Sequence, residues 1–215
     1  MSKYIILASS SPQRADIMRE LGFDFTAVPM DVDEVVLSTP EATVEANARL
    51  KALTAYPRFP HEIIIAADTV ISHAGKVLGK PKNAKAAEAV LSSLSGKKVK
   101  AVSSVAVINP SAESICVVTE SAVAHMRTMS QRDIAWYIGM GEPLTRAGSL
   151  GISRYGEIFI ERIEGAYSCI AGLPKRALLV AISKVGLAGD VLPNVMLENA
   201  SITATGLTIT NLKMT

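Results

Sequence analysis

Residues 5–14, IILASSSPQR, determine how the N-terminal part of the chain folds, because an apolar run there stops in hydroxyl groups and a helix begins. The apolar residues 5–8 predict a short buried strand. Ser11 followed by Pro12 predicts an N-cap and a first helical residue, since proline lacks the amide that this position leaves unpaired. Free amides and hydroxyls at such a helix start suit an anionic oxygen, and Arg14 adds a forked cation. The stretch therefore predicts a strand–turn–helix that can bind phosphate, although such serines also serve simply to cap a helix.

Length and composition indicate a globular chain that can bury a full core. It has 215 residues, of which 49% are hydrophobic and 20% charged, with a net charge of +2. No arginine-rich arm or basic helix is present, so we expect no nucleic-acid polymer as a partner. No apolar run approaches the roughly 20 residues of a membrane-spanning helix, and no signal sequence precedes the first strand. Cys116 and Cys169 form no close metal-type pair, which favours a reduced, cytoplasmic enzyme.

The order of predicted elements indicates a sheet with both parallel and antiparallel strands. Helices are predicted to begin at residues 12, 40, 84, 130 and 174, and strands to cover residues 5–8, 23–30, 63–67, 99–108, 115–126 and 158–163. A hairpin is predicted around Ala74-Gly75. The predicted fold class is α/β (α+β), with a mixed central sheet flanked by helices. One domain is expected over residues 1–186, and the alternating pattern in residues 187–215 predicts a C-terminal extension with an accessory hairpin or a partner-contacting strand.

Four charged residues lie at the ends of predicted elements or on a predicted helix face, so a compact fold can aim them at the serine-rich turn. They are Asp33, Lys51, Asp68 and Lys80. Two carboxylates can hold a divalent ion such as Mg²⁺, which bridges phosphate oxygens, while lysines neutralise the charge of a phosphate chain. An aspartate beside the metal can also accept a proton from an attacking water. The pattern favours phosphoanhydride chemistry, with Asp33 and Asp68 as metal ligands.

Each of these residues also has a simpler structural interpretation. Asp68 after an apolar strand is typical of a turn or a helix cap, Lys80 before a proline is typical of a solvated turn, and a lysine on an alanine-rich helix usually faces solvent. The sequence leaves open which of Asp31, Asp33 and Glu34 faces the site. The three histidines have no ligand spacing, and the sequence contains no Walker loop, zinc-type cluster or nucleophilic triad.

Six blocks of the sequence, in order between residues 4 and 186, resemble the Maf family of nucleoside triphosphate pyrophosphatases. They are LASSSPQR (7–14), ADTV (67–70), LGKP (78–81), LSG (94–96), AGSLGI (147–152) and GLP (172–174). The resemblance implies a two-lobed architecture similar to that of inosine triphosphatase, with the nucleotide in the cleft. It also implies hydrolysis between the α- and β-phosphates, a divalent cation (Mg²⁺ or Mn²⁺) and a homodimer.

The resemblance also implies roles for individual residues. Asp68 is similar to the family's proton acceptor, and Ser9 and Arg14 match the serine and the second arginine of its phosphate-binding turn. Lys51 and Lys80 align with its phosphate-contacting lysines. The remaining expected metal ligand, Asp33, stands where many members have glutamate.

Three positions are similar to those that sort the family by base. Thr69 matches the branch that acts on dTTP and UTP, whereas Gln13 and Ser153 replace that branch's arginine and glutamine. Arginine and glutamine differ in charge and donor number, so reaction type is predicted better than base preference. A 7-methyl-GTP pyrophosphatase and a non-catalytic nucleotide-binding regulator of cell division are the alternatives.

Overall fold

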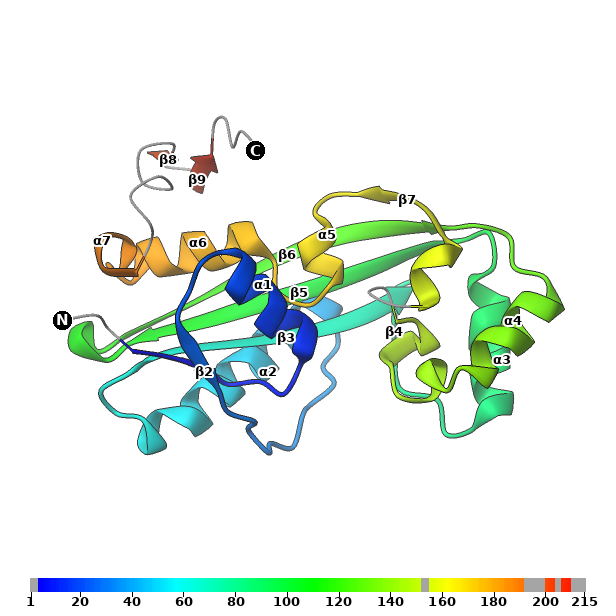
Figure 1. The fold of residues 1–215 in the computed structure, drawn as a ribbon, viewed down its shortest axis with the longest axis horizontal. Coiled ribbons are helices and arrows are strands. Elements are labelled where there is room, and N and C mark those ends of the chain that lie inside the picture. The colour runs from blue at the N-terminus through cyan, green and yellow to red at the C-terminus, as the bar shows by residue number, and fades with distance from the viewer. Residues whose placement is uncertain (1–3, 152–154, 192–199, 204–205, 210–215) are drawn as a thin grey trace.

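The computed structural model describes residues 4–151, 155–191, 200–203 and 206–209, and it contains a long, twisted seven-stranded sheet (Figure 1). The strand order is β2-β1-β3-β5-β6-β7, with β4 paired to β3. β1 lies parallel to β2 and β3, whereas the pairs that involve β4 to β7 are antiparallel. The predicted mixed sheet is thus confirmed. The strands are β1 Ile5–Leu7, β2 Phe25–Ala27, β3 Ile63–His73, β4 Lys76–Leu78, β5 Lys98–Asn109, β6 Ser114–Met126 and β7 Ile160–Glu164.

Helices cover both faces of this sheet (Figure 1). The side chains of Ile5, Leu7 and Ile63 pack with α1 and α6 in one core, and those of Ile6 and Ile64 pack with α2 in another. Because successive side chains of a strand point to opposite faces, the unbroken apolar runs of β1 and β3 serve both cores. The helices are α1 Pro12–Glu20, α2 Pro40–Ala55, α3 Ala84–Leu94, α4 Gln131–Gly139, α5 Tyr167–Ile170, α6 Lys175–Lys184 and α7 Ala188–Val191.

A further core lies at the other end of the sheet, where α3 and α4 pack (Figure 1). Its largest buried side chains include Tyr137 and Phe159, whose ring centroids are 5.1 Å apart. The molecule therefore has two lobes joined by β3, β5 and β6. No helix in the described part of the chain has the length and apolar character needed to cross a membrane.

Several predicted boundaries are wrong. β3 does not stop before Asp68 but continues to His73, because its antiparallel pairing with β5 runs through Asp68 and Thr69. The strand predicted over residues 23–30 is limited to Phe25–Ala27. In the C-terminal extension, β8 (Ala200–Thr203) pairs antiparallel with β9 (Gly206–Ile209).

Candidate functional site

A cavity of about 440 Å³ lies at an open part of one edge of β3. On this edge β1 pairs with β3 only as far as Ile65, and β4 begins to pair at Ile71. Within the described chain no strand pairs there with residues 66–70. Asp68 and Thr69 point to opposite faces of β3, and both line the cavity. The cavity is thus placed where neighbouring strands diverge, a common location for ligand sites in α/β proteins.

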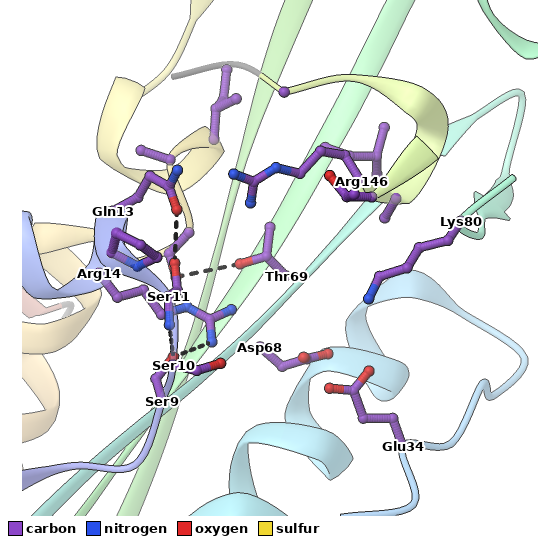
Figure 2. Close-up of a pocket in the computed structure, with 18 of the residues that line it drawn as sticks. Ser9, Ser10, Ser11, Gln13, Arg14, Glu34, Asp68, Thr69, Lys80 and Arg146 are labelled. Carbon is purple, nitrogen blue, oxygen red and sulfur yellow. Dashed lines mark hydrogen bonds between the residues drawn. The ribbon is translucent and has the colours of Figure 1, made fainter. Parts of the chain in front are cut away.

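The serine-rich turn forms one wall of the cavity (Figure 2). Arg14 Nη1 donates a hydrogen bond to Ser9 Oγ at 3.1 Å, and Arg14 Nε donates to the carbonyl oxygen of Gly172 at 2.9 Å. Burial lowers the pKa of Arg14, and the carboxylates of Asp68 and Glu34 oppose that shift. The turn therefore holds a guanidinium beside the serine hydroxyl, as an anion site requires.

The predicted start of α1 is confirmed, but the predicted side-chain cap is wrong. Ser11 has an extended backbone before Pro12, and its hydroxyl makes no capping bond. Instead that hydroxyl donates to Gln13 Oε1 at 3.0 Å, while the Ser11 backbone N–H donates to Ser9 Oγ at 3.2 Å. The Ser9 hydroxyl thus accepts from the Ser11 backbone and from Arg14, and the Ser11 hydroxyl binds the Gln13 side chain rather than a helix amide.

A buried ion pair forms the opposite wall. Lys51 Nζ lies 2.7 Å from Asp68 Oδ1 and 2.7 Å from Glu34 Oε1. The side chains of Lys51 and Asp68 are only 10% and 7% exposed, whereas that of Glu34 is 57% exposed. Asn47 Nδ2 donates to the second Asp68 oxygen at 3.2 Å. Lys51 and Asn47 both come from α2, so this face of the helix is directed at the cavity and not at solvent.

Glu34, and not Asp33, is the acidic residue that segment 31–34 brings to the cavity. Asp33 is exposed and is not among the lining residues, so the structure does not support its expected role as a metal ligand. The cause lies in α2, where the Asn47 side chain accepts from Val35 N at 2.9 Å and donates to Val35 O at 3.0 Å. This clamp holds the preceding Glu34 beside Lys51. Burial opposes ionisation of Glu34, but the hydrogen bond and charge of Lys51, with Arg14 and Lys80, hold its pKa below the usual range.

Of the other predicted site residues, three line the cavity and one lies outside the described part of the chain. Lys80, just after β4, and Gln13, on α1, both line the cavity. Thr69 also lines it, and its hydroxyl lies 2.8 Å from Ser103 Oγ and 3.4 Å from the Gly172 carbonyl. Ser153 lies outside the described residues. Among the charged residues that line the cavity, Arg146 was not predicted, because only its place next to the glycine-rich stretch gave a signal.

The carboxylates of Asp68 and Glu34 fit a divalent cation that is shared with a substrate. Mg²⁺ is commonly held by one or two carboxylates together with substrate phosphates and water. Within the described residues no group of three or more histidine, cysteine or acidic side chains is arranged to hold a metal by itself. The donor set therefore suits a metal that arrives with phosphate oxygens and does not suit a closed structural site.

The comparisons with known proteins agree with this geometry. Residues 4–185 match the family described as Maf-like protein. The chain is 41% identical over 170 residues to a protein of Acinetobacter baylyi, covering 78% of this chain and 92% of that one. It is 36% identical to a protein of Dictyoglomus thermophilum (86% and 98% covered) and 38% identical to one of Pyrococcus abyssi (85% and 96% covered). All three relatives are named dTTP/UTP pyrophosphatase. By the extent of these matches, the chain belongs to the Maf family.

Proposed function

We propose that the protein is a nucleoside triphosphate pyrophosphatase that prefers dTTP and UTP and releases the monophosphate and pyrophosphate. The observation that carries the proposal is the buried Asp68 carboxylate, held by Lys51 in the same cavity as Arg14 and Lys80. A carboxylate that can take a proton from water and cations that can neutralise phosphate oxygens are the groups such a hydrolysis needs. The names of the relatives support the same reaction and the same bases.

In the proposed reaction a water oxygen bonds to the α-phosphorus, and the bond from that phosphorus to the α–β bridging oxygen breaks. Asp68 takes the proton of the water, while Lys51 and Asn47 fix the direction of its carboxylate. Arg14 and Lys80 bind the phosphate oxygens, whose negative charge would otherwise oppose the attack. Ser9 holds the Arg14 guanidinium in place. Positioning and charge neutralisation supply most of the rate.

We propose Asp68 and Glu34 as the residues that hold a divalent cation. When bound, Mg²⁺ or Mn²⁺ supplies positive charge to the phosphate oxygens. Removal of the cation with a chelator is expected to stop turnover, and added Mg²⁺ or Mn²⁺ is expected to restore it. Full activity in the chelator would overturn this part of the proposal.

The test of the function is product analysis with a purified sample and a panel of nucleoside triphosphates that includes UTP, dTTP and 7-methyl-GTP. We expect pyrophosphate and a monophosphate; release of orthophosphate alone would contradict the proposed bond cleavage. Faster turnover of 7-methyl-GTP than of UTP and dTTP would favour the alternative specificity.

Asp68→Asn separates an enzyme from a nucleotide-binding regulator. Loss of the general base lowers kcat by about 10²- to 10⁴-fold, whereas the variant still folds and still binds nucleotide. The matched control is Asp24→Asn, because Asp24 is exposed and is not among the cavity-lining residues. A wild-type protein that binds nucleotide but never turns it over would support the regulator. The expected homodimer and cytoplasmic location stay predictions; light scattering of the purified protein tests the former.

A further inference from the structure

Arg146 is one of the charged residues that line the cavity. It directly precedes the 3-10 turn η4 (Ala147–Ser149), and its side chain extends across the cavity toward the side lined by Gln13 and Thr69 (Figure 2). Its Nε atom is buried, and within the described part of the chain it has no hydrogen-bond partner. An arginine has donors and no acceptor, and a buried donor without an acceptor is unfavourable. The position of Arg146 therefore points to a ligand that brings acceptor atoms.

The backbone that carries Arg146 is fixed to the same elements that carry the proposed site. The Gly148 N–H donates to the Gly79 carbonyl at 3.0 Å, next to Lys80. Gly148 has a φ of +64°, and a Cβ there would lie 3.0 Å from Ile71 Cγ2 on β3, so the turn packs directly on the strand of Asp68. The Ser149 N–H donates to the Arg146 carbonyl at 3.1 Å. This anchoring fixes the backbone of Arg146 before a ligand arrives, which reduces the entropy lost on binding.

The groups across from Arg146 also present donors. The Ser11 hydroxyl donates to Gln13 Oε1, which leaves the Gln13 amide nitrogen as the group available to a ligand. The Thr69 hydroxyl is engaged with Ser103 and Gly172. Leu150 and Ile170 add apolar surface to the same cavity. This side of the cavity thus combines apolar walls with neutral and cationic donors.

The phosphate chain of the substrate is expected on the side of the cavity away from Arg146. Asp68 and its partner Lys51 lie on the face of β3 that carries α2, whereas Thr69 points to the opposite face, toward Gly172. Figure 2 shows Asp68, Glu34 and the amine of Lys80 gathered on one side of Thr69 and Arg146 on the other. If the α-phosphorus lies at Asp68, the nucleoside end of the substrate is the part that remains to fill the side of Arg146.

We propose that Arg146 is a specificity residue that donates hydrogen bonds to ring carbonyl oxygens of the nucleobase, with the Gln13 amide as a second donor. The inference rests on the proposed function, because it takes a nucleoside triphosphate as the ligand. Uracil and thymine present a carbonyl at position 4, whereas cytosine presents an amino group there. An amino group facing Arg146 would set donor against donor and leave the guanidinium unpaired, so the site selects against cytosine.

The test compares UTP with CTP, which carry the same sugar and phosphates. A well-placed arginine contact discriminates between bases by about 10- to 100-fold, so Arg146→Gln is expected to lower the UTP-to-CTP ratio of kcat/KM by that factor. Lys80→Gln removes the same charge from the same cavity and is the matched control. It should lower kcat/KM for both nucleotides and leave their ratio intact.

Each other outcome overturns the inference. An equal loss of kcat/KM for UTP and CTP in Arg146→Gln would show that Arg146 binds phosphate. Unchanged kcat/KM values for both nucleotides would show that it does not contact the substrate. Circular dichroism melting checks that the variant folds. If Arg146→Gln does not fold, Arg146→Lys is used instead, because it keeps the charge but loses the forked guanidinium. The inference then requires a lower UTP-to-CTP ratio of kcat/KM in the folded Arg146→Lys variant.

Binding separates this inference from the proposed function. The affinities of non-hydrolysable UTP and CTP analogues, with a methylene group between the α- and β-phosphorus atoms, need no turnover. Suppose that the wild type distinguishes the two analogues, that Arg146→Gln abolishes this difference, and that the wild type releases no pyrophosphate. That result would refute the proposed hydrolase activity alone. Hydrolysis with no dependence of base preference on Arg146 would refute the specificity role alone.

Discussion

Lys51→Met tests the energetic role of the buried ion pair. The variant leaves the Asp68 carboxylate, 7% exposed, with the Asn47 amide at 3.2 Å as its remaining hydrogen-bond donor among the described residues. Removing one partner of a buried ion pair lowers the free energy of unfolding by about 3–5 kcal/mol. The second ion pair of Lys51, with Glu34, contributes about 0–1 kcal/mol at most, because the Glu34 side chain is 57% exposed. We therefore expect the free energy of unfolding to fall by about 3 kcal/mol. In a chain of 215 residues this corresponds to a decrease in Tm of about 6–12 °C.

Urea unfolding, followed by circular dichroism, measures the change in the free energy of unfolding. The slope m of this free energy against urea concentration should be the same in the variant and the wild type. Lys80→Met is the matched control, because it removes an exposed lysine from the same cavity and should change stability by less than about 0.5 kcal/mol. The double variant Lys51→Met/Asp68→Asn removes both charges and should recover most of the loss. The reasoning is refuted if Lys51→Met unfolds at the same urea concentration as the wild type, or if the double variant is no more stable than the single one.

Three further predictions concern acid, a helix cap and the thiols. The pKa of Glu34 lies below its ordinary value of 4.5, so the ionised carboxylate stabilises the fold above pH 4.5. This contribution to stability is lost as the pH falls through the lowered pKa. The urea midpoint of Glu34→Gln should therefore drop less in acid than that of the wild type. The capping box of α4 joins Ser130 and Asp133, and Ser130→Ala should lower the free energy of unfolding by about 1 kcal/mol in the same assay. Burial raises the pKa of Cys169 to about 11, so mass spectrometry after iodoacetamide treatment at pH 8 should find Cys116 alkylated first and Cys169 only in denaturant; early labelling of Cys169 would contradict its burial.

The parts of the fold that sequence predicts are those that local pattern determines. The unbroken apolar run of β3 indicated a strand covered on both faces, and helices do cover both faces. Pro12 after serines located the start of α1 correctly. The predicted hairpin after β3 was confirmed as well, and it brings Lys80 to the cavity of Asp68. In each case the residues that decide the structure are neighbours in the chain.

The failures have long-range causes. A charged residue in an apolar run predicts the end of a strand, yet Asp68 lies inside β3 because Lys51 on α2 pairs with it. Which acidic residue of segment 31–34 faces the cavity depends on the clamp from Asn47, a residue outside that segment. α5 has only four residues, too few to show a helical period. These features depend on contacts between distant segments, for which a single sequence carries no periodic signal.

The open edge of β3 has a consequence for how the protein can change. Asp68 and Thr69 are adjacent in the chain but project from opposite faces of the strand into one cavity. We therefore expect a substitution at position 69 to alter which nucleotides the pocket accepts without changing the contacts of Lys51 and Asn47 with the carboxylate of Asp68. If the proposed roles hold, selectivity can change by single substitutions while the proposed hydrolytic residues are kept, and libraries at positions 13, 69 and 146 would test this directly.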